Sequence, residues 1–201
     1  MLELLNISKQ FGKNHVLNNL SLTIGEGDLI YIHGINGCGK STLFKIICDI
    51  MEADQGSIFL DQGISIGALI ENPAFLENES MKYNLKFLAH FNNRYDPECI
   101  QALCQKFSLD FSSREKMKNY SVGMRQKVGI IQAIMEDQHL VLFDEPTRGL
   151  DEESIRAFAD TVNLLVSQGK SVVIASHDHL DHLSFKKSYL LRDGQLIEDE
   201  V

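Results

Sequence analysis

Residues 34–42 combine three glycines, a lysine and two hydroxyl side chains at a spacing that suits phosphate binding. Glycines let the backbone curl tightly, so that its N–H groups can converge on an anion. Lys40 can reach the outer phosphates, Ser41 can offer its hydroxyl to Mg²⁺, and Thr42 can hydrogen-bond a phosphate. The pattern G-x-x-x-x-G-K-[ST] therefore predicts a nucleotide site. Its predicted binding residues are Gly34, Asn36, Gly37, Cys38, Gly39, Lys40, Ser41 and Thr42.

The residues on either side supply the strand and the helix that such a loop needs. Residues 28–33 are mostly apolar and predict a buried strand running into the loop. Apolar residues after the loop recur at helical spacing, which predicts a helix with its positive N-terminus under the phosphates and with Lys45 and Asp49 facing water. These apolar residues are Leu43, Phe44, Ile46, Ile47 and Ile50. The context favours a phosphate-binding loop over a glycine turn with an unrelated lysine.

Two carboxylates follow the apolar run of residues 140–143. In nucleotide hydrolases with this type of loop, an acidic residue at the end of a strand holds the Mg²⁺ shell, and we assign that role to Asp144. Glu145 comes one residue later and can orient or deprotonate the attacking water. A strand that merely ends in a solvated turn is the alternative, but the phosphate-binding loop argues against it.

A second apolar strand, residues 171–175, is followed by Ser176 and His177. His177 can hydrogen-bond the γ-phosphate or the attacking water, and we predict a catalytic role for it. The wider group of His177, Asp178, His179, Asp181 and His182 also permits a metal-site interpretation. Phosphate sensing by His177 and a solvated surface for the others explains the group better.

The remaining pattern predicts an α/β fold: a core with a mainly parallel sheet, an N-terminal antiparallel β part and an inserted helical region. Parallel strands place ligands at their carboxyl ends, where residues 34–42 lie. Strands are predicted over residues 2–7, 16–24, 28–33, 57–60, 64–70, 139–143 and 171–175, with a hairpin at Asp193-Gly194. Helices are predicted over residues 81–88, from Asp96-Pro97 through Phe107, over 121–135 and over 152–168. We expect a single domain, with core residues 1–71 and 138–201 and a helical insertion over about 72–137.

Composition bounds the class of protein. The chain has 201 residues, of which 44% are hydrophobic, so it can bury a core, and no apolar run approaches the ~18 residues of a membrane helix. The net charge of −9 disfavours nucleic acid as a partner. The N-terminus lacks the basic region and small-residue cleavage site of a signal peptide, and the cysteines lack zinc-site spacing. We therefore expect a cytoplasmic protein with free thiols at Cys38, Cys48, Cys99 and Cys104.

Together these motifs resemble the ATP-binding subunit of an ABC transporter over nearly the whole chain. Residues 120–124, Tyr-Ser-Val-Gly-Met, stand where the family usually has Leu-Ser-Gly-Gly-Gln, so Ser121 and Gly123 match and the other three depart. Arg125-Gln126 then follow, as the family often has them. Residues 149–151, Gly-Leu-Asp, resemble its D-loop, and His177 its switch histidine.

The resemblance implies an ATPase that binds ATP and Mg²⁺ and converts ATP and water to ADP and phosphate. It implies that Ser121, Gly123 and Asp151 contact the nucleotide held by an opposing subunit. Phe11 lies where the family places an aromatic ring against adenine, the alternative being a core phenylalanine. Glu71 replaces the family's Q-loop glutamine, and its carboxylate can still bind Mg²⁺ beside Ser41 and Asp144.

The implied partners are a second ATP-binding subunit, identical or different, and a separate membrane-spanning permease. The dimer would close on ATP and drive the permease from the inner face of the cell membrane. The signature segment and Glu71-Asn72-Pro73 resemble the drug-, peptide- and bacteriocin-export or self-protection subgroup. The apolar residues 73–76 either meet that partner or belong to the core of the insertion.

Two other classes of function remain as alternatives. One is a soluble, non-transport ABC protein acting on ribosomes or DNA, although such proteins usually carry two cassettes or long coiled-coil insertions, neither of which this sequence shows. The other is a regulatory nucleotide-binding module with little turnover, against which Glu145 argues.

Overall fold

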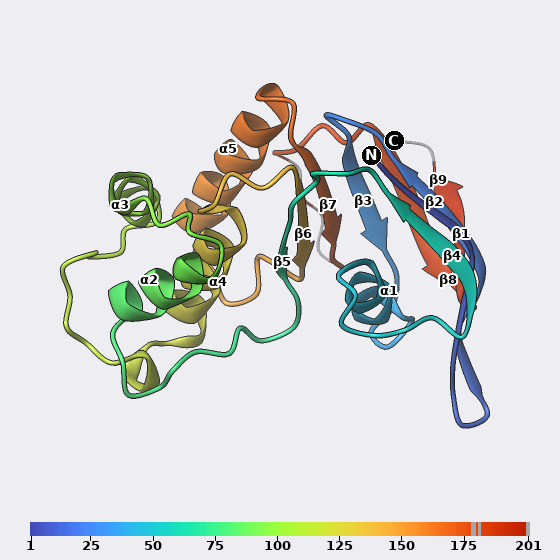
Figure 1. Ribbon diagram of the computed structural model, residues 1–201, viewed down its shortest axis with the longest axis horizontal. Coiled ribbons are helices and arrows are strands. Elements are labelled where there is room, and N and C mark those ends of the chain that lie inside the picture. The colour runs from blue at the N-terminus through green and yellow to red at the C-terminus, as the bar shows by residue number, and fades with distance from the viewer. Residues whose placement is uncertain (178–179, 181, 200–201) are drawn as a thin grey trace.

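The computed structural model describes residues 1–177, 180 and 182–199, and its strands form two sheets (Figure 1). The larger sheet has the order β5-β6-β7-β3-β8-β9, and the smaller has the order β2-β1-β4. The strands are β1 (Leu2–Phe11), β2 (Asn14–Ile24), β3 (Leu29–His33), β4 (Gln55–Leu60), β5 (Ile66–Leu69), β6 (Leu140–Asp144), β7 (Ser171–Ala175), β8 (Lys187–Arg192) and β9 (Gln195–Asp199). The helices are α1 (Lys40–Ile47), α2 (Met81–Phe91), α3 (Pro97–Lys106), α4 (Val122–Ile134) and α5 (Glu152–Ser167), with a 3₁₀ turn η1 (Met117–Asn119). In the described residues no helix is long and apolar enough to cross a membrane.

The centre of the larger sheet is parallel and buried. β6 pairs with β7, and β3 lies between β7 and β8, all in parallel register. Every residue of β6 and β7 is buried, as their unbroken apolar runs predict for strands covered on both faces. The carboxyl ends of β3, β6 and β7 therefore meet at one edge of the sheet, where they bring residues 34, 145 and 176 together.

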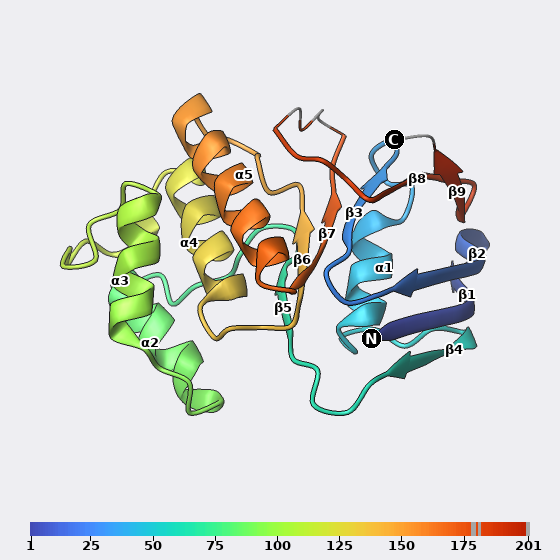
Figure 2. The same cartoon turned by 90° about the horizontal axis from the view of Figure 1, so that it is seen from above.

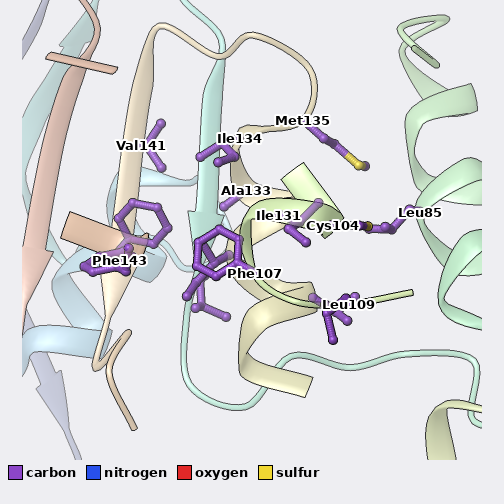
Figure 3. Close-up of a cluster of buried hydrophobic side chains, with 14 of the residues drawn as sticks. Leu85, Cys104, Phe107, Leu109, Ile131, Ala133, Ile134, Met135, Val141 and Phe143 are labelled. Atoms are coloured by element: carbon purple, nitrogen blue, oxygen red, sulfur yellow. The ribbon is translucent and has the colours of Figure 1, made fainter. Parts of the chain in front are cut away.

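Helices cover both faces of this sheet. α4 and α5 lie on one face, and α1 lies on the other, between the larger sheet and the three-stranded sheet (Figures 1 and 2). The two apolar clusters follow this division, one around α2 to α5 and one around α1. Figure 3 shows the first cluster, in which Phe107, Ile131 and Phe143 from separate elements converge. Burial of this kind contributes roughly 1.5–3 kcal/mol for each large apolar side chain.

Helix starts follow the predicted capping residues. Asp96 accepts hydrogen bonds from the N–H groups of Glu98 and Cys99 ahead of Pro97, and the Ser121 hydroxyl accepts one from Met124. Such caps satisfy amide groups that have no partner within the helix. The predicted hairpin is also confirmed: β8 and β9 pair antiparallel around Asp193-Gly194. Both turn residues have positive φ, 52° and 76°, as a two-residue turn of this type requires.

Two predictions about local structure are wrong. α1 ends at Ile47, so Ile50 lies beyond the helix with 68% of its surface exposed. Lys45 does not simply face water, because its Nζ lies 2.6 Å from a carboxylate oxygen of Glu71. The helical insertion is interrupted after α3: residues 107–116 carry no helix, because Ser108 at φ 55° ends α3 and the Asp110 side chain holds a turn by accepting from the Ser112 N–H.

Candidate nucleotide-binding and catalytic site

The loop between β3 and α1 has the backbone shape that its glycines predict. Gly37 and Gly39 have φ values of 81° and 117°, a region that side chains disfavour. A Cβ at Gly39 would also lie 3.0 Å from the carbonyl oxygen of Val16. The loop leads directly into the N-terminus of α1, so its amides and the helix dipole are both available to an anion.

A cavity of about 550 Å³ opens beside this loop, within the size range of small-molecule sites. Ten of the predicted site residues line it: Phe11, Asn36, Gly37, Gly39, Lys40, Ser41, Thr42, Glu71, Asp144 and Glu145. Four residues without a predicted role also line it: Val16, Asn72, Gln126 and Arg148. The predicted residues Gly34, Cys38, Ser121, Gly123, Asp151 and His177 do not line it.

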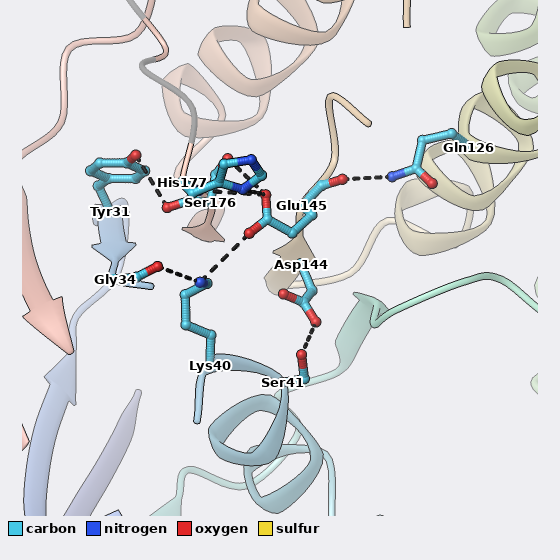
Figure 4. Close-up of polar contacts among 9 residues, drawn as sticks. All are labelled: Tyr31, Gly34, Lys40, Ser41, Gln126, Asp144, Glu145, Ser176 and His177. Carbon is cyan, nitrogen blue, oxygen red and sulfur yellow. Dashed lines mark hydrogen bonds and ion pairs between the residues drawn. The ribbon is translucent and has the colours of Figure 1, made fainter. Parts of the chain in front are cut away.

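Lys40 is almost completely buried, with 6% of its surface exposed. Its ammonium donates to the carbonyl oxygen of Gly34 at 2.7 Å and lies 3.6 Å from Oε1 of Glu145 (Figure 4). A buried cation requires partners of this kind, because isolated charge in a low-dielectric interior is costly. The ammonium is therefore held at the loop, where phosphate oxygens could replace these partners.

Ser41 and Asp144 form the candidate metal site. The Ser41 hydroxyl donates to Oδ2 of Asp144 at 2.5 Å (Figure 4), and the Glu71 N–H also donates to the Asp144 carboxylate. Burial raises the pKa of Asp144 above its ordinary value, and the neighbouring charge of Glu145 acts in the same direction. A hydroxyl and a carboxylate are hard oxygen ligands of the kind that Mg²⁺ prefers, so these residues fit the ion.

Glu145 is held from several directions at the end of β6. Its Oε2 accepts from the Ser176 hydroxyl at 3.1 Å and lies 2.8 Å from Nδ1 of His177 (Figure 4). Its Oε1 is buried and accepts no hydrogen bond from the residues that the structure describes. Buried polar atoms normally have a partner, so this oxygen is a natural acceptor for a water molecule or a substrate group.

The matching family model is that of the ABC transporter, and it covers residues 17–148, which include the loop, Asp144 and Glu145. The chain belongs to the ABC transporter family. It binds ATP and is an ATPase, as this membership implies.

Relatives and solved structures agree with this assignment. YybJ of Bacillus subtilis (strain 168), an uncharacterised ABC transporter ATP-binding protein, is 31% identical over 92% of this chain and 88% of its own length. YdbJ of the same organism is 32% identical, and the chain spans 61% of its length. SrtF of Streptococcus pyogenes, a lantibiotic transport ATP-binding protein, is 29% identical over the whole chain and 91% of its own length. An ABC transporter ATP-binding subunit has the same fold, with a TM-score of 0.89 and 24% identity over 99% of this chain and 89% of its own.

Phe11 and Glu71, expected from the ABC family to contact adenine and Mg²⁺, both line the cavity. Phe11 is 48% exposed, so the interpretation as a core phenylalanine is wrong. Its ring lies 5.7 Å from Nζ of Lys9 and remains available for stacking. The Glu71 carboxylate pairs with Lys45, and the Glu71 backbone N–H donates to Asp144. A metal-binding role for the Glu71 side chain stays a prediction.

The signature segment and Asp151 lie outside the cavity. Ser121 is exposed and caps α4, while Asp151 caps α5 through Ser154 and lies 3.8 Å from Nζ of Lys127. Gly123 approaches the chain so closely that an added Cβ would lie 2.3 Å from the carbonyl oxygen of Gly149. Packing alone therefore accounts for this glycine, and its expected contact with nucleotide stays a prediction.

Of the histidine and aspartate group weighed as a metal site, Asp178, His179 and Asp181 lie outside the described residues. No cluster of metal ligands is found among the residues that are described. Sequence reasoning missed the contact of His177 with Glu145, and it assigned no role to Gln126. The amide of Gln126 donates to the Glu145 carbonyl oxygen at 2.9 Å.

Proposed function

We propose that this chain is the ATP-hydrolysing subunit of an ABC transporter that exports a peptide antibiotic or protects the cell against one. The single observation that carries the catalytic part is the Glu145 carboxylate, whose Oε1 is buried 3.6 Å from the Lys40 ammonium with no hydrogen bond from the described residues. The substrate class is supported by two relatives, the lantibiotic transport protein SrtF and the bacitracin transport protein BcrA of Enterococcus faecalis.

Phosphate binding would use the loop and its lysine. Asn36, Gly37, Gly39 and Ser41 line the cavity, so their backbone amides would be available to phosphate oxygens. The Lys40 ammonium would exchange Gly34 and Glu145 for phosphate oxygens. Ser41 and Asp144 would hold Mg²⁺, which when bound neutralises charge on the phosphates. Phe11 would offer its exposed ring to the adenine.

Hydrolysis would use Glu145 as the general base. Its Oε1 would accept a proton from water as the water oxygen bonds to the γ-phosphorus, and the bond to the bridging oxygen would break to leave ADP and phosphate. Ser176 and His177 hold the other carboxylate oxygen, which fixes the direction of Oε1. His177 is 55% exposed at its side chain and is therefore also open to the γ-phosphate.

A second subunit would complete the site. Ser121 and the N-terminus of α4 are exposed outside the cavity of their own chain, where they can meet a nucleotide held by another copy or by a related subunit. A hydroxyl and free amides at a helix start favour phosphate. This arrangement supports a head-to-tail dimer that closes on ATP and reopens after hydrolysis.

A groove beside β5 would receive the membrane subunit at the inner face of the membrane. It consists of two adjoining cavities of about 280 and 300 Å³, and we define it by Ile50, Ala68, Pro73 and Phe91. Ile50 and Phe91 are 68% and 71% exposed, so they would offer apolar surface to a partner with an apolar docking segment. Within the segment 73–76, Phe75 packs on the core of the insertion, while Leu76 is 45% exposed and would be available to the membrane subunit.

Co-purification and a phosphate-release assay test this proposal together. The tagged wild-type chain should co-purify with a membrane protein. The Phe91→Asp variant should lose this partner. The Phe59→Asp variant, a matched change on exposed β4, should still co-purify with it. Both variants should hydrolyse ATP like the wild-type chain, because neither residue lines the cavity. Capture of ribosomes instead of a membrane protein would favour the soluble, non-transport alternative.

A further inference from the structure

Glu145 has a backbone conformation that its own sequence disfavours. Its φ is 48°, in the left-handed region that costs a residue with a side chain roughly 1–3 kcal/mol. It also precedes Pro146, and a residue before proline is normally driven to an extended conformation. Such a conformation persists only when surrounding contacts fix it.

Contacts to both of its peptide groups fix it here. The Glu145 N–H donates to the carbonyl oxygen of Ala175 at 2.8 Å, which ties it to β7. Its own carbonyl oxygen accepts from Nε2 of Gln126 at 2.9 Å and, at a longer 3.3 Å, from the Arg148 N–H within the turn. Figure 4 shows the Gln126 side chain reaching from α4 to this carbonyl.

Gln126 is buried, with 3% of its surface exposed. A buried amide that lost its acceptor would be costly, so its position is coupled to that of the Glu145 carbonyl. Two further contacts join the same part of α4 to the loop after β6: Gly123 against Gly149, and Lys127 near Asp151. The N-terminal half of α4 and the loop therefore form one packed unit.

We infer that Gln126 is a positioning residue for hydrolysis: by holding the Glu145 carbonyl from α4, it maintains the left-handed backbone that aims the Glu145 carboxylate at the water. The inference rests on the proposed role of Glu145 as general base. Because Ser121 caps the N-terminus of α4, the same bond links the segment proposed to meet the opposing nucleotide with the proposed base, Glu145, of its own chain.

The first variant is Gln126→Met, which keeps the length and volume of the side chain but removes the donor. We expect kcat for ATP hydrolysis to fall at least tenfold, with the KM and the directly measured Kd for ATP within twofold of the wild-type values. Gln105→Met on the exposed face of α3 is the matched control and should change neither. A drop in ATP affinity equal to the drop in kcat/KM, with kcat unchanged, would contradict the inference.

A double-mutant cycle separates positioning from general structural damage. If Gln126 acts through Glu145, adding Gln126→Met to Glu145→Gln should change the residual turnover by less than twofold. The same tenfold loss in both backgrounds would overturn the inference. If Glu145→Gln alone turned over ATP normally, the proposed general base itself would be wrong, which is a distinguishable result.

If the Gln126→Met variant does not fold, the Gln126→Glu variant tests the same positioning role. The introduced carboxyl is isosteric but can donate to the carbonyl only when protonated, and burial raises the pKa of such a group. Turnover relative to the wild-type chain should therefore recover as pH falls from 8 to 6. A pH-independent ratio, measured on protein that binds ATP normally, would refute the positioning role.

Discussion

Replacing Asp28 with asparagine should destabilise the chain by about 2 kcal/mol near neutral pH. Asp28 is 1% exposed, at the turn that leads into β3. Burial would raise the pKa of its carboxyl, but hydrogen bonds from Lys186, the Gly25 N–H and Lys187 outweigh this and lower it from 3.8 to about 2. The lysine nitrogens lie 2.6 and 3.0 Å from its two oxygens. That difference in pKa corresponds to about 2 kcal/mol, since each pH unit is worth about 1.4 kcal/mol.

The sign follows from which state holds the proton more tightly. The folded state has the lower pKa, so this stabilisation is complete above the unfolded pKa and is lost as pH falls through about 2. By pH 3 roughly half of it should remain. The difference in unfolding free energy between wild-type and Asp28→Asn chains should therefore be nearly constant from pH 6 to about pH 5 and narrow as the pH falls through the unfolded pKa of 3.8 towards pH 3.

Urea unfolding monitored by circular dichroism at several pH values measures this difference. Asp54→Asn is the control: Asp54 also pairs with a lysine and has a lowered pKa, but it lies on the surface, so the change should be much smaller. Thermal unfolding near neutral pH should show a melting temperature lower by about 4–8 °C for Asp28→Asn. Equal unfolding free energies of the wild-type and Asp28→Asn chains at pH 6, or a difference between them that does not decrease towards pH 3, would refute the stabilising role of the Asp28 ion pairs.

Three further predictions concern the site. Lys40→Ala should weaken ATP binding about tenfold or more in a fluorescence titration and abolish phosphate release, since charge-assisted hydrogen bonds contribute ~1.5–3 kcal/mol. Wild-type turnover by this variant would show that residues 34–42 are not the phosphate-binding loop. Alkylation of Cys38, half-buried within the loop, should block hydrolysis, and ATP should protect it; full activity after modification confirmed by mass spectrometry would count against this. Glu145→Gln should hydrolyse ATP at least ~100-fold more slowly and accumulate as a dimer in ATP but not in ADP. Adding Ser121→Arg should abolish that dimer in light scattering, and its persistence would place the subunit contact elsewhere.

Local signals in the sequence predicted most of the fold. The buried runs of β6 and β7, the caps at Asp96 and Ser121, and the Asp193-Gly194 turn depend on residues close together in the chain. Local pattern did not reveal where α1 ends, because Ile50 continues the helical spacing while the backbone turns at Asp49 with a φ of 57°.

The candidate site was predictable in its residue types but not in its pairings. Motif spacing identified Lys40, Ser41, Asp144 and Glu145, and the parallel sheet accounts for their meeting at one edge. The bonds of Glu145 to His177 and Gln126 join residues 32 and 19 positions apart on separate elements. Such contacts depend on how helices pack on the sheet, and no local spacing encodes them. The Lys45–Glu71 pair was not predicted for the same reason, because its two residues lie 26 positions apart in the chain.

The close approach of Gly123 to Gly149 has a consequence for how this sequence can evolve. With an added Cβ only 2.3 Å from a backbone oxygen, an alanine at position 123 must displace the loop at residue 149. Gly149 is itself at φ 73°, so it cannot readily accept a side chain while the loop keeps its shape. Substitutions at positions 123 and 149 should therefore occur together among descendants of this chain.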